Sequence, residues 1–275
     1  MAEGAVITSM REASEEVTDV KVADVKSLFD THVNDGKVIL VVEGADDKEV
    51  YEKVMDANSV CFYVDCNCDK HFVILDALNE RYGERLLAIK DADFDRLDNT
   101  INPYPNMALT DTHDMEGMIV AECLSELLGD DAVRCQGINL AEIYAELEDI
   151  SYLKWFNHAS HCGINFSESA LDLDINAYFN ACVKKTDNVV SVTLADMYAF
   201  KTAHPGVPEK ELCNGHDIFE RIYIRAKAAN VANYAKKPFF RRLRRAYPKD
   251  RFLNTDLFKA IKDWEALNNQ VILAA

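Results

Sequence analysis

The sequence of 275 residues lacks several features that would assign it to a familiar class of protein. No stretch approaches the ~20 apolar residues of a membrane-spanning helix. The N-terminus, MAEGAVITSMREASEEV, has neither the basic start nor the apolar run of a secretion signal. Internal repeats, low-complexity tracts and linkers rich in proline, glycine and serine are also absent. These absences predict a cytoplasmic globular protein with no membrane partner.

Cysteine pairs with the spacing of a zinc motif are absent as well. The eight cysteines are scattered through segments of regular pattern, which predicts small core side chains in a reducing compartment. Two local groups of zinc-type ligands are present: Cys66 and Cys68 with His71, and His158 and His161 with Cys162. Neither group has a CxxC pair with a matching second pair, so a structural zinc site is the less favoured alternative.

The charge is divided unequally along the chain, whose net charge is −17. Residues 1–150 contain 34 acidic and 12 basic residues, whereas residues 151–275 contain 13 acidic and 18 basic residues. An overall acidic balance disfavours a polyanionic partner. The segregation instead suggests that the first half gathers metal ligands and the second half contacts phosphate groups. The alternative is that the acids only solvate the first half.

Apolar runs of strand length alternate with stretches of helical period up to about residue 130. The expected strands are 37–42, 60–64, 85–90 and 106–110, and the expected helices are 20–32, 46–56, 70–82 and 114–128. This alternation is typical of a parallel sheet flanked by helices, so the predicted fold class is α/β. Amphipathic helical segments dominate afterwards. We expect an N-terminal helical segment (1–34), a sheet-containing catalytic domain (35–130) and a mostly helical C-terminal domain (131–275).

Acidic residues end two of the apolar runs. Glu43 follows VILVV, and Asp91 and Asp93 follow LLAIK. Ligands bind outside the carboxyl ends of parallel strands, so these three carboxylates are the candidate catalytic and metal-binding residues. Asp93 lies on the same side as Asp91 if the chain stays extended, and a cation would offset their repulsion. Gly44 permits a sharp turn, and Asp47 in the next helix is either a further ligand or a helix-start acid.

Two further segments carry candidate functional residues. The segment TDTHDMEGM is dense in acids, with Glu116 as a candidate ligand of a second cation and His113 as a candidate phosphate contact or acid. His216 is a weaker candidate for catalysis than for helix capping. Phe239 and Phe240 could pack or stack on bases. The candidate contacts to a nucleic-acid backbone, or to an acidic surface, are Lys236, Lys237, Arg241, Arg242, Arg244 and Arg245.

The runs VILVVEGADD and LLAIKDADFD together resemble the Toprim domain, in which one strand ends in Glu–Gly and a later strand ends in Asp-x-Asp. The spacing of Glu43 and Asp47 is similar to that in OLD-family nucleases. The segments TDTHDMEGMI, NGHDIF and LNTDLFKAIKDWE resemble more narrowly a bacterial group of OLD-like Toprim proteins. That group includes a toxic nuclease effector of the PARIS phage-defence system.

The resemblance implies a Toprim-type sheet over residues 35–128 and cleavage of nucleic acid with Mg²⁺ or Mn²⁺. It implies that Glu43 is a metal ligand or general acid/base, that Asp91 and Asp93 are metal ligands, and that Asp47 and Glu116 complete the set. It favours RNA such as transfer RNA over DNA. The chain has no GxxxxGK[ST] P-loop, so an ABC-type ATPase partner would be a separate polypeptide. A homo-oligomer is compatible with the sequence.

Two alternatives remain open from the sequence. A haloacid-dehalogenase-like phosphatase would use DADFD as nucleophile and acid, although that motif normally follows the opening strand. A non-catalytic regulatory partner would bind a cation for structure alone, or would dock another protein on its acidic surface.

Overall fold

The protein is described by a computed structural model apart from residues 1–20, 33–34, 65–70, 101–103, 122, 133–134, 136–137, 167–173, 187–190, 233–234 and 275. The chain forms two compact units. The first, the sheet unit, comprises Met1–Asp91, Asn102–Leu109 and Pro248–Ala275. The second, the helical unit, comprises Ala92–Ile101 and Thr110–Tyr247.

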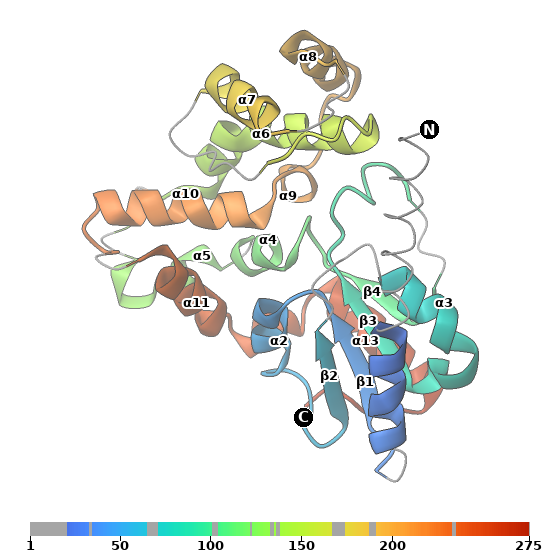
Figure 1. Cartoon of the computed structure of the whole chain (residues 1–275). Helices are drawn as coiled ribbons and strands as arrows, with labels where there is room; N and C mark the ends of the chain where they lie inside the picture. Colours follow the sequence, from blue (N-terminus) through green and yellow to red (C-terminus); the bar gives the residue numbers. More distant parts are fainter. Residues whose placement is uncertain are drawn as a thin grey trace, which may run out of the picture. The chain divides into compact units, whose positions relative to one another are not determined.

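Four parallel strands form the sheet of the sheet unit (Figure 1). They are β1 (Val38–Val42), β2 (Val60–Val64), β3 (Leu86–Lys90) and β4 (Met107–Leu109), in the order β2-β1-β3-β4. Every residue of β1 and β3 is buried, as expected of central parallel strands covered on both faces. Each strand falls within a predicted apolar run. The predicted α/β class with a parallel sheet is therefore confirmed.

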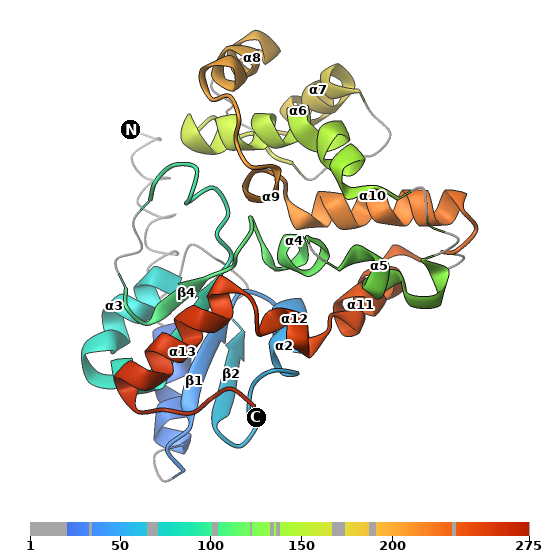
Figure 2. The same cartoon turned by 180° about the vertical axis from the view of Figure 1, so that it is seen from behind.

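Helices cover both faces of this sheet. They are a helix over residues 21–31, α2 (Ala45–Tyr51), α3 (His71–Tyr82), the short η2 (Gly83–Arg85), α12 (Lys249–Phe252) and α13 (Asp256–Asn268). On one face, Phe29 of the first helix and Leu75 of α3 join a buried cluster with Ile39 and Val41 of β1. On the other face, α13 packs against β4 and lies in front of the sheet in Figure 2.

The end of the chain returns to the sheet unit. The amide of Asp56 donates to the carbonyl of Ile272 at 2.7 Å, and the amide of Ala274 donates to the carbonyl of Val54 at 2.8 Å. The buried carboxylate of Glu265 accepts two backbone amides of the same segment, at 2.6 and 2.8 Å. The two units therefore divide the chain differently from the predicted segments, because long-range pairing brings the C-terminus back beside residues 54–56.

The second half of the chain is mostly helical, as predicted. The described helices of the helical unit are α4 (Met115–Val120), α5 (Leu124–Leu128), η3 (Gly129–Asp131), α6 (Leu140–Ala159), α7 (Ile175–Lys184), α8 (Leu194–Ala203), α9 (Glu209–Leu212), α10 (Gly215–Ala228) and α11 (Lys236–Ala246). The core of α6, α7 and α8 buries Trp155, Tyr178 and Met197. The helical run expected over 114–128 is broken at Cys123, whose φ of −139° and ψ of 26° are not helical. No helix in the described ranges is long and apolar enough to span a bilayer.

Candidate functional site

The sheet reverses its strand order between β1 and β3. From β1 the chain passes to β2 on one side, then crosses back to β3 on the other side. Connections diverge at such a reversal and leave a crevice at the carboxyl ends of the strands, where ligands bind in open parallel sheets. Glu43 follows β1 and Asp91 follows β3, and the amide of Asp91 donates to Oε1 of Glu43 at 3.0 Å. The structure thus brings together two of the three predicted strand-tip acids.

Lys90 is a buried cation next to this pair that the sequence analysis missed. It is 6% exposed, and its Nζ donates to the carbonyl of Asp91 at 2.9 Å. A positive charge here favours the ionised form of acidic side chains nearby. The available signal was a lysine at the end of the otherwise apolar run LLAIK, directly before the acids.

Asp47 has a structural role at the start of α2. Its Oδ2 accepts the amide of Gly44 at 2.7 Å, an interaction that satisfies a backbone donor before the first turn. Gly44 itself is extended, with φ −136° and ψ 166°, so the chain does not make at this residue the sharp turn that glycine permits. An added Cβ would lie 3.4 Å from Oδ2 of Asp47, an ordinary contact. The role of Asp47 as a cation ligand stays a prediction.

Asp93 does not continue the extended strand. Its φ is +45°, in the left-handed region, which aspartate enters more readily than most residues. Its amide donates to the carbonyl of His113 at 2.6 Å. The condition under which Asp91 and Asp93 would lie on the same side, an extended chain, is therefore not met, because the backbone turns at Asp93.

The loop that carries Asp93 is fastened within the helical unit. The amide of Ala92 donates to Oγ1 of Thr110 at 2.9 Å, and the guanidinium of Arg96 donates to the carbonyls of Thr110 and Thr112. Phe94 lies in the buried cluster of α6, α7 and α8. The loops at 92–96 and 110–112 are thus hydrogen-bonded to each other. Phe94 anchors the first of them in the core of α6, α7 and α8.

Asp114 joins the N-termini of two helices. Its side chain accepts the amide of Gly117 in α4 at 2.8 Å and the amide of Gly215 in α10 at 2.6 Å. Burial raises the pKa of this carboxyl, but His113, whose Nδ1 lies 3.4 Å from Oδ2, and the two amides outweigh burial and keep the pKa below its usual value. A Cβ on Gly215 would lie 2.1 Å from Oδ1 of Asp114, so α10 approaches too closely for any other residue. His113 is itself 4% exposed and packs edge-to-face on Phe94, so its imidazole lies away from solvent.

Replacing Asp114 by alanine is expected to lower the free energy of unfolding of the helical unit by about 2–4 kcal/mol. Two helix caps are lost, each worth about 1 kcal/mol, and the buried amides of Gly117 and Gly215 lose their acceptors. Asparagine has a single acceptor oxygen, so Asp114→Asn is expected to cost about half as much. Urea unfolding measures both, with the exposed Asp130→Asn as control. Equal stability of Asp114→Ala and Asp130→Asn would contradict the double cap.

Glu116, predicted as a cation ligand, has protein cations as partners. It is 3% exposed, and its Oε1 accepts Nε of Arg244 at 3.0 Å and Nη2 at 2.7 Å. Oε2 lies 3.6 Å from Nδ1 of His216, and this carboxylate raises the pKa of His216 to about 9 against the opposing effect of burial. A metal ion bound through Oε1 would have to displace Arg244, and the role of Glu116 as a cation ligand stays a prediction.

The basic segment forms α11, but not all of its cations face solvent. Arg244 is 4% exposed and holds Glu116, so it is not a surface contact as predicted. Arg242 donates to the carbonyl of Leu128 at the end of α5 at 2.9 Å and to the carboxylate of Asp131 at 2.7 Å. Phe239 and Phe240 are 0% and 8% exposed, so neither is available to stack on bases. The exposed cations of the predicted set are Lys236, Lys237, Arg241 and Arg245.

Of the two local groups of zinc-type ligands, only the second lies within the described residues, and it is not assembled as a site. Cys66 and Cys68 lie outside the described residues. Cys162 is 2% exposed, and Nε2 of His158 lies 3.2 Å from a carboxylate oxygen of Asp98. Within the part of the chain that the structure describes, no three or more His, Cys, Asp or Glu side chains form a group that could hold a metal ion in this arrangement.

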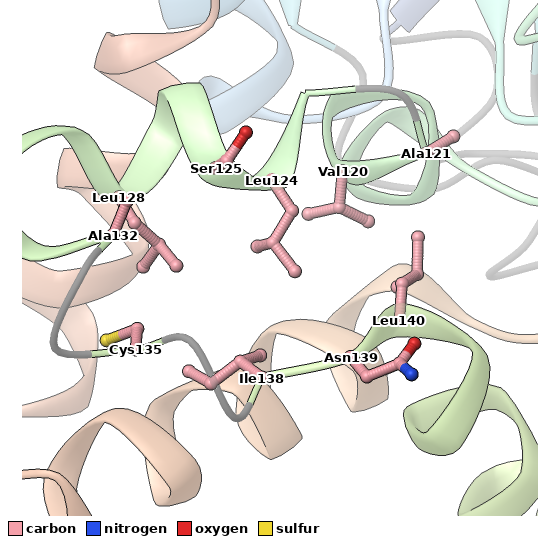
Figure 3. A pocket seen from close by; sticks show the side chains of 10 residues that line it. All are labelled: Val120, Ala121, Leu124, Ser125, Leu128, Ala132, Cys135, Ile138, Asn139 and Leu140. Carbon is pink, nitrogen blue, oxygen red and sulfur yellow. The ribbon is translucent and has the colours of Figure 1, made fainter.

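The helical unit also contains an apolar pocket of about 690 Å³ (Figure 3). Side chains of Val120, Leu124, Leu128, Ile138 and Leu140 line it, together with Ser125 and Asn139. The lining residues carry no ionisable group other than the thiol of Cys135. The lining formed by the described residues therefore offers none of the charged groups that phosphate or cation chemistry requires.

Comparisons with models of known protein families, with curated proteins and with solved structures found no match to this chain. The resemblance to Toprim proteins therefore rests on the motifs quoted above and on their place at the strand tips.

Proposed function

We propose that the protein is a metal-dependent phosphodiester hydrolase, a nuclease of Toprim type that binds its cation at the tips of β1 and β3. The observation that carries the proposal is the hydrogen bond from the amide of Asp91 to Glu43 at the reversal of strand order. It places two acidic residues at the position where open parallel sheets bind ligands.

The donor set fits Mg²⁺ or Mn²⁺. Mg²⁺ prefers hard oxygen ligands and is commonly held by one or two carboxylates, with water and substrate phosphate completing its coordination. Glu43 and Asp91 meet that need without a larger cluster, and Asp47 and Asp93 are the further candidate ligands. When bound, such a cation orients the attacking water and stabilises charge on the leaving oxygen. Glu43 also holds the backbone of Asp91, and buried Lys90 balances the local negative charge.

The substrate and biological role rest on the resemblance alone. It favours RNA such as transfer RNA over DNA, and a toxic effector in bacterial phage defence. Because the chain has no P-loop, we assign ATP hydrolysis to a separate ABC-type ATPase partner.

Incubation of the full chain with labelled transfer RNA, total RNA and duplex DNA tests the proposal, with and without an ABC-type ATPase encoded beside it. We expect cleavage with Mg²⁺ or Mn²⁺, and none with EDTA or with a Glu43→Ala variant. Hydrolysis of p-nitrophenyl phosphate that is lost in Asp91→Asn would instead identify a haloacid-dehalogenase-like phosphatase. Absence of cation-dependent cleavage under every condition would leave a non-catalytic partner protein as the better account.

A further inference from the structure

Three exposed cations form a row along α11. Lys237, Arg241 and Arg245 are spaced by four residues, and all three side chains are exposed. Residues four apart lie on the same side of a helix, and four residues rise about 6 Å along its axis. The row therefore presents three positive charges over about 12 Å.

The rest of α11 is held against the helical unit, which fixes the direction of this row. Phe239, Phe240 and Leu243 are buried. Arg244 points inward to Glu116, and Arg242 holds the end of α5. These contacts fix the orientation of α11 on the helical unit. The row therefore stays exposed at the surface.

The three like charges of the row lower the stability of α11 itself. No acidic residue occurs in KKPFFRRLRRA, and like charges four residues apart destabilise a helix by about 0.2–0.5 kcal/mol per pair. Lys236 and Lys237 also lie at the N-terminus, where the helix dipole disfavours cations. Departures from local rules of this kind are expected at functional surfaces.

The positive charge is concentrated in this part of the chain. Residues 215–246, which span α10 and α11, contain nine basic and two acidic residues in a protein of net charge −17. At least five of the nine contact carboxylates. They are Arg221 and Arg225 on α10, which face α6, and Lys236, Arg242 and Arg244 on α11, which face Glu220, Asp131 and Glu116. A local positive field on an otherwise acidic protein attracts a polyanion to this surface in particular.

We propose that Lys237, Arg241 and Arg245 bind the sugar-phosphate backbone of a nucleic acid. The inference rests on the proposed function only where it takes that nucleic acid to be the substrate. The contact itself needs no metal ion. Because the aromatic residues of α11 are buried, stacking on bases is not part of this contact, and the row acts through its charges.

Fluorescence anisotropy of the full chain in EDTA, over a series of NaCl concentrations, measures this contact without cleavage. The probes are a labelled single-stranded RNA, a transfer RNA and a duplex DNA. For the triple variant Lys237→Gln/Arg241→Gln/Arg245→Gln, the slope of log affinity against log salt is expected to become shallower by about 2 for single-stranded RNA and about 3 for duplex DNA. Arg241→Gln alone is expected to change the single-strand slope by about 0.7.

The control variant Lys184→Gln/Lys185→Gln/Lys210→Gln removes the same charge from exposed positions at the end of α7 and in α9. Its slopes are expected to match those of the wild type. The inference is overturned if the wild type binds none of the probes, if the α11 variant keeps the wild-type slope, or if the control loses as much. A protein that binds through this row in EDTA but never cleaves with Mg²⁺ would contradict the proposed function and leave this inference standing.

Discussion

Arg244→Ala is expected to lower the free energy of unfolding of the helical unit by about 3–5 kcal/mol, the usual cost of removing one partner from a buried ion pair. Arg244 and Glu116 are 4% and 3% exposed, and two guanidinium nitrogens lie within 3.0 Å of the same carboxylate oxygen. Without the guanidinium, the charge of Glu116 stays buried and loses its principal hydrogen-bond donors.

The two tryptophans of the chain make this measurement specific. Trp155 is buried in the helical unit and Trp264 in the sheet unit, so fluorescence in a Trp264→Phe background follows the helical unit alone. The adjacent exposed change Arg245→Ala is expected to alter stability by less than about 0.5 kcal/mol in urea unfolding. An equal effect of the two alanine variants would contradict the buried ion pair.

A second variant separates the ion pair from simple packing. Replacing both partners with apolar residues of similar volume, Glu116→Leu with Arg244→Met, removes the uncompensated charge. This double change is expected to recover most of the lost stability, because a buried pair and a well-packed apolar pair are often similar in free energy.

Glu43→Gln is expected to reduce the rate of metal-dependent cleavage by at least about 10³-fold, which corresponds to roughly 4 kcal/mol in activation free energy. Glutamine keeps the size of the side chain and an oxygen that can accept the amide of Asp91, but it lacks the negative charge that a cation requires. Initial rates on the cleaved substrate, compared with those of Asp46→Asn, an exposed control in the first turn of α2, measure the effect. The control is expected to stay within about twofold of the wild type.

Comparison with Glu43→Ala separates two roles of this side chain. If Glu43→Gln cleaves at the wild-type rate and only Glu43→Ala is inactive, then Glu43 acts by holding the backbone of Asp91, and its assignment as a metal ligand or general acid/base is wrong.

The sheet and one part of the candidate site were predictable because their signals are local. The run VILVV is apolar throughout and LLAIK is apolar up to its final lysine, a pattern that indicates central parallel strands and therefore which residues follow their carboxyl ends. The meeting of Glu43 and Asp91 follows from that placement. The burial of Lys90 was not predictable from the sequence, because a lysine at the end of a strand normally lies at the surface.

The remaining differences come from contacts between distant parts of the chain. Glu116 and Arg244 are 128 residues apart in sequence, so no local pattern shows that one neutralises the other. Asp93 departs from the extended conformation where its amide binds the carbonyl of His113. The return of the C-terminus to residues 54–56 involves only a short segment after α13, too short to give a periodic signal.

The most direct test of the central claim is the binding of Mn²⁺ to the full chain in the absence of substrate, measured by electron paramagnetic resonance. The wild type and Asp46→Asn are expected to bind the ion, whereas Glu43→Gln and Asp91→Asn are expected to lose most of that binding. Equal binding by all four proteins, or no binding by the wild type, would contradict a cation site at the tips of β1 and β3.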